Sequence, residues 1–211
     1  LCLNNPVGYI LMFAIAFGVA FVLTWMFGYK DEVQETTEKN IEAEKKSDAP
    51  AEIAQEKTSE TGAQTLYSPL EGTAIPLSEV KDATFASEVL GRGMAVIPSK
   101  GEVKAPCDAT VSTIFDTKHA IGLATESGLE LLIHIGVDTV ELGGKFYTAH
   151  VKDGDVVKKG QTLITFDMDA IKAAGYDVTT PLIVTNTDDY EEVKMLAEGI
   201  VNNGSEVLEV K

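Results

Sequence analysis

The chain has 211 residues and a formal net charge of −16, from 17 Lys and Arg against 33 Asp and Glu. Residues 1–29 carry no charged side chain, residues 30–65 carry 5 Lys against 10 Asp and Glu, and residues 66–211 carry 12 Lys and Arg against 23 Asp and Glu. This acidic charge argues against a nucleic-acid-binding protein, because basic patches supply most of the affinity for phosphate backbones. It favours a protein partner with a basic face.

Residues 6–29 form an uncharged run, PVGYILMFAIAFGVAFVLTWMFGY. A helix of this length, rising about 1.5 Å per residue, crosses a hydrocarbon core of about 30 Å. Tyr9 lies near one end of the run and Trp25 near the other, where interfacial aromatic side chains are found. A signal peptide would show a basic start and a small-residue cleavage site, and neither is visible. We predict one transmembrane helix in residues 1–29, and we expect the chain, which begins with Leu, to be part of a longer membrane protein.

Residues 30–65 are acidic and contain no aromatic residue and almost no large apolar ones. Such a segment cannot bury enough surface to offset the entropy lost on ordering. We predict a flexible acidic linker that tethers the following domain to the membrane, where tethering raises its effective concentration at a partner site.

Residues 66–211 alternate short apolar and β-branched runs with Gly, Asp, Asn and Pro, which is typical of strands and turns. Two helices are predicted, at Met168–Ala174 and, after an N-cap at Thr187 and Asp188, at Asp188–Glu198. This pattern predicts a mainly β domain, a β-sandwich or barrel, with short helices. The predicted strands are Thr65–Ser68, Met94–Pro98, Glu102–Lys104, Ala109–Ile114, Ala120–Ala124, Glu130–Ile135, Thr162–Phe166, Pro181–Val184 and Glu206–Val210.

The segment from Gly101 to Gly160 resembles the barrel-sandwich hybrid of biotinyl and lipoyl domains. The turn that would hold a modified lysine in such carriers contains Lys158 and Lys159 here, without the Met-Lys or Asp-Lys-Ala setting. We therefore interpret this turn as structural.

His134 stands in the strand pattern GLELLIHIGVDTVELGG. Because alternate residues of a strand share a face, Leu132, His134 and Gly136 lie on one face, and Leu131, Ile133 and Ile135 lie on the other. A histidine on a strand is more often structural than catalytic. Here, however, a group that titrates near neutral pH stands beside a glycine that would let a partner or a phosphate approach closely. The pattern favours a functional site.

His119 follows a turn and precedes the strand Ala120–Ala124, so two imidazoles on neighbouring strands could face each other. The same pair, with a carboxylate from a partner, would suit zinc. Since the chain supplies only these two good ligands, we treat a zinc site at His119 and His134 as optional and expect no required cofactor. Cys2 and Cys107 lie in different parts of the chain, so no disulfide framework is indicated.

The segment GLELLIHIGVDTVEL resembles the active-site signature of the glucose-type IIA domains of the bacterial phosphoenolpyruvate-dependent sugar phosphotransferase system. The resemblance covers residues 66–211 and includes SPLEGTAIPLSEVKDATFASEVLGRGMAV, KAPCDATVSTIFDTKHAI, HVKDGDVVKKGQ and TPLIVTN. Residues 1–29 resemble the last membrane span of a sugar permease (IIC) domain. The tail TWMFGYKDE is similar to permeases of the β-glucoside, sucrose and trehalose branch, with the IIB, IIC and IIA domains in one chain.

The resemblance implies a phosphotransferase that drives sugar uptake. His134 would accept a phosphoryl group from the histidine-containing phosphocarrier protein (HPr) and donate it to a cysteine of a IIB domain. His119 would hydrogen-bond the phosphoryl oxygens, and Thr117 would fix the tautomer of His119. The IIA domain would lie on the cytoplasmic side of the cell membrane.

The resemblance also implies a docking surface around the histidines. It comprises an apolar ring and two acidic residues that meet a basic partner: Asp82, Phe85, Val89, Phe115, Leu132, Asp138 and Val140. Without the resemblance, each aromatic would be interpreted as core and each Asp as solvated surface. His150 is expected to be structural. Cys107 is not expected to be the phosphorylated cysteine of a IIB domain, because no IIB-like sequence is present.

Two alternatives come from other classes. A phosphorylation-dependent regulatory module would bind permeases or kinases through the same face. A zinc hydrolase of the lysostaphin-like type would need an additional His-x-His pair, which the chain lacks. The identity of the sugar is left open, because specificity lies in a membrane domain.

Overall fold

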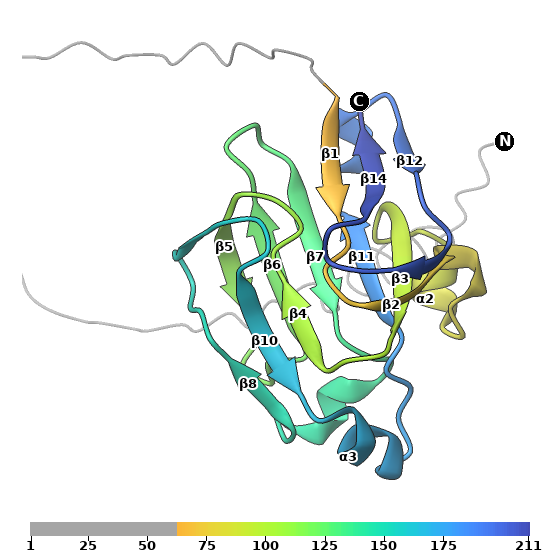
Figure 1. Ribbon diagram of the computed structural model, residues 1–211, viewed down its shortest axis with the longest axis vertical. Helices are drawn as coiled ribbons and strands as arrows, with labels where there is room; N and C mark the ends of the chain where they lie inside the picture. Colours follow the sequence, from red (N-terminus) through yellow and green to blue (C-terminus); the bar gives the residue numbers. More distant parts are fainter. Residues whose placement is uncertain (1–62) are drawn as a thin grey trace, which may run out of the picture. The chain divides into compact units, whose positions relative to one another are not determined.

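The computed structural model describes residues 63–211, coloured in Figure 1. The predicted membrane helix and nearly all of the predicted linker lie outside these residues. Between residues 63 and 211, no helix has the length and apolarity needed to cross a bilayer.

Three antiparallel sheets make up the domain. One three-stranded sheet has the order β1-β14-β12, and a second has the order β4-β10-β8. Their strands are β1 (Gln64–Tyr67), β14 (Glu206–Val210), β12 (Val193–Met195), β4 (Glu102–Lys104), β10 (Thr162–Phe166) and β8 (Tyr147–Ala149). The eight-stranded sheet runs in the order β13 (Gly199–Val201), β2 (Gly72–Pro76), β3 (Arg92–Pro98), β11 (Thr180–Val184), β7 (Glu130–His134), β6 (Ala120–Ala124), β5 (Ala109–Ile114) and β9 (Val156–Val157).

Helices are few and short: η1 (Leu77–Glu79), α2 (Ala83–Ala86), η2 (Thr139–Leu142), α3 (Met168–Ala173) and η3 (Thr187–Asp189). Within residues 63–211, both α-helices start at an aspartate whose carboxylate accepts from free backbone N–H groups of the first turn. Asp82 caps α2, and Asp167 caps α3. The predicted mainly β class with short helices is confirmed.

The predicted helix over Asp188–Glu198 is wrong. The segment holds the single turn η3 and then the strand β12, which pairs with β14. Val193, Met195 and Ala197 are half-buried and pack on the core, whereas the residues between them are exposed. This alternation has the period of a strand, and pairing with β14 outweighs the helix propensity of the Glu and Lys residues.

The main core lies on the inner face of the eight-stranded sheet, toward both small sheets (Figure 1). On β7, Leu131 and Ile133 point into it, together with buried side chains of the small sheets such as Val103, Leu163 and Leu208. These side chains bury apolar area, which provides the main favourable free energy of folding.

A second, smaller cluster covers part of the outer face, and we call it the outer cluster. Its buried members are Leu77, Val80, Phe85, Ala95 and Ile183. The segment that contains η1 and α2 therefore lies over β3 and β11, and β11 is buried along its whole length. Leu132 on β7 packs at the edge of this cluster.

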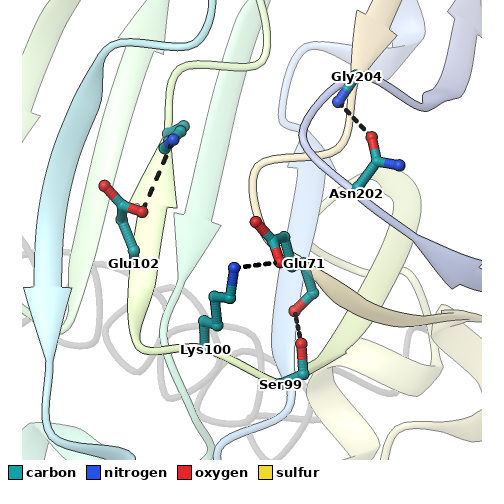
Figure 2. Close-up of polar contacts among 7 residues, drawn as sticks. Glu71, Ser99, Lys100, Glu102, Asn202 and Gly204 are labelled. Atoms are coloured by element: carbon teal, nitrogen blue, oxygen red, sulfur yellow. Dashed lines mark hydrogen bonds and ion pairs between the residues drawn. The ribbon is translucent and has the colours of Figure 1, made fainter.

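The other end of the outer face is uncovered, and we call the row Ile200, Thr73 and Ile97 on β13, β2 and β3 the bare end. Ile97 is 45% exposed and Ile200 is 94% exposed. Beside this row, Lys100 Nζ lies 2.6 Å from a carboxylate oxygen of Glu71, and the Ser99 hydroxyl donates to the Glu71 carbonyl (Figure 2).

Candidate active site

Two histidines meet on the outer face, where β6 begins and β7 ends. His134 pairs with Ala120 in the sheet, and the amide of Ile135 donates to the His119 carbonyl at 2.6 Å. The two ring centroids are 4.8 Å apart, with the ring planes at 79°. The sheet register therefore brings the two imidazoles edge to face.

The ring of His134 is oriented by its own chain. Nδ1 lies 2.8 Å from the Gly136 carbonyl oxygen. Because a carbonyl only accepts, Nδ1 carries the hydrogen and Nε2 keeps its lone pair. His134 is thus held as the tautomer whose Nε2 can act as a nucleophile.

Gly136 has φ +83°, a conformation that favours glycine. A Cβ atom here would lie 2.5 Å from Cγ2 of Thr139 and 2.6 Å from the Asp177 carbonyl oxygen. The expectation that this glycine leaves room for a partner or a phosphate is wrong, because protein atoms fill that space. The glycine is required so that its carbonyl can turn back to His134.

His119 is oriented by a turn between β5 and β6. The amide of Lys118 donates to the Phe115 carbonyl at 2.7 Å, and Lys118 itself has φ +55°. The turn places Oγ1 of Thr117 2.5 Å from Nδ1 of His119. When the hydroxyl donates this bond, the hydrogen of the neutral ring is on Nε2, where it can be donated to a ligand.

Burial keeps both rings neutral. His119 is only 5% exposed, and burial lowers its pKa to about 4, with the neighbouring His134 as a further cause. Burial also lowers the pKa of His134. The bond to Gly136 and the charges of Asp82 and Asp138 oppose that shift. The site therefore presents two uncharged imidazoles at neutral pH.

Two aromatic rings form walls beside the pair. The ring centroid of Phe85 lies 5.0 Å from that of His134, and the centroid of Phe115 lies 5.5 Å from that of His119. Phe85 is 7% exposed and belongs to the outer cluster, so it offers little free area to a partner.

The other residues of the expected docking surface differ in exposure. Val89, Asp138 and Val140 are exposed, whereas Asp82, Phe115 and Leu132 are half-buried. The carboxylate of Asp82 is already engaged as the cap of α2. His150 lies apart from the pair, next to β8, where Nε2 contacts the Thr165 hydroxyl at 2.9 Å.

The optional zinc site has no support. Among the residues that the structure describes, no group of three or more His, Cys, Asp or Glu side chains gathers as metal ligands would. Cys107 is buried, and burial raises the pKa of its thiol to about 11, so it is not a thiolate at neutral pH.

Three residues behind Gly136 also orient the site and were not among the predicted site residues, namely Thr139, Tyr147 and Asp177. The amide of Val137 donates to the Asp177 carbonyl at 2.9 Å, and the hydroxyls of Thr139 and Tyr147 donate to the Ile135 carbonyl. Thr139 stands inside the motif, but Tyr147 and Asp177 are distant in sequence and carry no local signal.

The chain is similar to several known proteins. A family profile described as "phosphoenolpyruvate-dependent sugar phosphotransferase system, EIIA 1" matches residues 64–190. The β-glucoside-specific EIIBCA component of Dickeya chrysanthemi is 46% identical over 192 residues, which cover 89% of this chain and 29% of that protein. The glucose-specific EIIA component of Oceanobacillus iheyensis is 46% identical over 147 residues, which cover 69% of this chain and 89% of that protein.

Among solved structures, the glucose permease IIA of Mycoplasma capricolum matches with a TM-score of 0.67 and 33% identity. The match covers 71% of this chain and 97% of that one. The chain spans only 23% to 29% of the length of the β-glucoside-specific relatives that it matches.

Proposed function

The chain belongs to the EIIA 1 family of the phosphoenolpyruvate-dependent sugar phosphotransferase system, and on this premise we propose that Nε2 of His134 carries the phosphoryl group. The observation that supports this most is the bond from Nδ1 of His134 to the Gly136 carbonyl. It leaves the Nε2 lone pair free on a neutral ring that faces His119. A neutral imidazole is a nucleophile at cytoplasmic pH.

In the first step, Nε2 of His134 attacks the phosphorus of the phosphohistidine of HPr. The donor N–P bond breaks as the new bond forms, and the Nδ1 hydrogen stays on its bond to Gly136. In the second step, a cysteine thiolate of a IIB domain attacks the same phosphorus and releases Nε2. Phosphoryl transfer passes through a loose transition state, so positioning and charge stabilisation contribute most of the rate.

His119 supplies the stabilisation. Its Nε2–H donates to the phosphoryl oxygens, while Thr117 holds Nδ1 and thereby the tautomer. Around the pair, the partner proteins dock on Val89, Phe115, Leu132 and Val140 with Phe85 behind them, and the acidic Asp82 and Asp138 attract a basic partner face.

The whole protein is proposed to be a membrane permease of the β-glucoside branch. In this proposal, residues 1–29 form the last membrane helix, of which residues 6–29 cross the bilayer. Residues 30–65 form the linker. Residues 66–211 form a cytoplasmic IIA domain of the sandwich type. The Dickeya chrysanthemi match supports this, because its 192 residues exceed the length of the described part and so include residues before position 63.

The test uses the full 211-residue chain with labelled phosphoenolpyruvate, enzyme I and HPr. We expect an acid-labile, base-stable label that is absent from His134→Ala and retained by the control His150→Ala. His150 is suitable because it is exposed and outside the pair. Undiminished label in His134→Ala would refute the assignment, and an unlabelled wild-type chain with active carriers would refute the proposed function.

A further inference from the structure

The carbonyl of Ile135, one residue before Gly136, accepts two hydroxyl groups. Thr139 Oγ1 donates to it at 2.6 Å, and Tyr147 Oη donates at 3.2 Å. Thr139 comes from η2 and Tyr147 from β8, so two separate elements meet on one oxygen. Both lone pairs of the carbonyl are then satisfied.

These hydroxyls lie out of reach of solvent. Thr139 is 0% exposed and Tyr147 is 5% exposed. The Tyr147 ring stacks on Phe166, with centroids 6.1 Å apart and an interplanar angle of 26°. A side chain held in this way donates in one direction only, and buried hydrogen bonds of this kind are costly to remove.

The next peptide, between Gly136 and Val137, is oriented at both of its polar ends. Its carbonyl accepts from Nδ1 of His134, and its N–H donates to the Asp177 carbonyl at 2.9 Å. Asp177 is itself fixed, because its carboxylate accepts from the amide and the hydroxyl of Thr179 at 2.8 and 2.6 Å. The methyl group of Thr139 closes the space beside the Cα atom of Gly136.

We propose that Thr139 and Tyr147 are positioning residues for phosphoryl transfer, acting through the Ile135 and Gly136 backbone on the tautomer of His134. The inference rests on the proposed function of His134. Without the two hydroxyls, the Ile135–Gly136 peptide can rotate, and the Gly136 carbonyl leaves the line of the Nδ1–H bond. The ring then loses its preference for the tautomer with a free Nε2, and fewer molecules are competent to attack.

The test compares the full wild-type chain with Thr139→Val, which keeps the side-chain shape and removes the hydroxyl. Ring-nitrogen chemical shifts in NMR report the tautomer of His134, and labelled HPr reports the rate of phosphoryl acceptance. We expect a mixed tautomer and acceptance slowed about tenfold, the equivalent of one lost buried hydrogen bond. Thr139→Ser restores the hydroxyl, and we expect it to recover acceptance to within about twofold.

Tyr147→Phe gives a second measurement that preserves the stack on Phe166. Its longer bond predicts a smaller slowing, about threefold. The matched control is Thr187→Val. Thr187 is also buried and donates to a backbone carbonyl, that of Val184, at the opposite end of β11. We expect this control to leave the tautomer and the acceptance rate unchanged.

The outcomes separate a positioning role of the two hydroxyls from a purely structural one. Unchanged tautomer and rate in Thr139→Val, with only a loss of stability, would show a structural role and overturn the inference, as would a Thr139→Ser variant as slow as Thr139→Val. If Thr139→Val does not fold, Tyr147→Phe decides by the same two readouts. If the wild-type chain accepts no phosphoryl group, the proposed function fails, and the NMR arm still shows whether the hydroxyls set the tautomer.

Discussion

The outer face of the eight-stranded sheet has two unlike regions. Over β3 and β11, η1 and α2 cover it, Ile183 is completely buried, and the two histidines lie beside this cover. At the bare end, Ile97 and Ile200 occupy the same face of the same sheet and are exposed. Lying on this face of the sheet therefore does not by itself shield a side chain from water. The cover removes water, and the removal of water keeps the imidazoles neutral.

The polar contacts of the two regions differ in the same way. Near the bare end, the ion pair of Lys100 and Glu71 stands in solvent, which screens it (Figure 2). Beside the cover, uncharged groups bond in sequence from Asp177 through Gly136 to His134. Bonds in a dry environment are stronger and more directional, as a site that must hold one tautomer requires.

The largest expected effect is on the rate of phosphoryl transfer, and it tests the histidine pair beside the cover. His119→Gln keeps a donor near the phosphoryl group but not the ring geometry. We expect this variant to accept a phosphoryl group on His134 and to pass it to a IIB domain about a thousandfold more slowly. Rapid-quench measurement of the two steps separates them. Normal transfer to IIB would refute the role given to His119.

The next effect compares the cover with the bare end directly. Phe85→Ala removes a buried ring and should lower the free energy of unfolding by about 3 kcal/mol in urea titrations. It should also raise the pKa of His134 toward the ordinary value, since water reaches the ring. The control Ile200→Ala, at a residue 94% exposed, should change stability by less than about 0.5 kcal/mol. Equal losses in both variants would contradict the contrast between the two regions.

The smallest effect is a pH dependence. Because the pKa of His119 is about 4 in the folded chain and about 6.5 when unfolded, the unfolded state binds more protons between these values. Stability should therefore fall as pH is lowered through this window. We expect about 2 kcal/mol of the loss between pH 7.5 and pH 4.5 to come from His119.

Urea titrations at the two pH values measure this contribution as the difference between wild type and His119→Gln. The exposed His150 supplies the control, and His150→Gln should follow wild type at both pH values. A loss on acidification that is the same in His119→Gln as in wild type would show that His119 is not the group responsible.

Much of the sheet could be predicted from local patterns. The strands at β4, β5, β6, β10 and β14 have the predicted bounds. For β4, β5 and β10, a breaker residue marks one end of the apolar run, namely Gly101, Asp108 and Asp167. The predicted strands did not include β2, β8, β9, β12 and β13. Most of these strands have only two or three residues, too few for a period to appear, and their place is set by partners far away in the sequence.

The site could be predicted in part for the same reason. Thr117 and His119 directly precede β6, and His134 ends β7, so the pairing of these two adjacent strands brings the three residues together. Each of the three lies in a segment whose pattern is visible in the sequence. One of the hydrogen bonds to the Ile135 carbonyl comes from Tyr147 of another sheet, and the peptide after Gly136 is oriented by its bond to the Asp177 carbonyl. Only the folded chain brings these groups together, so no spacing in the sequence could indicate them.

The first and last strands of the domain, β1 and β14, are neighbours, with Gln64 opposite Val210. A domain whose two ends leave from one place can be inserted into, or appended to, another polypeptide without any rearrangement of its interior. The same fold can therefore be spliced into a large multidomain chain or exist as an independent protein, and the relatives named EIIBCA and EIIA illustrate both arrangements. The pairing of β1 with β14 therefore allows the domain to be joined to different proteins. The histidine pair lies elsewhere, at the start of β6 and the end of β7, so such a fusion leaves it undisturbed.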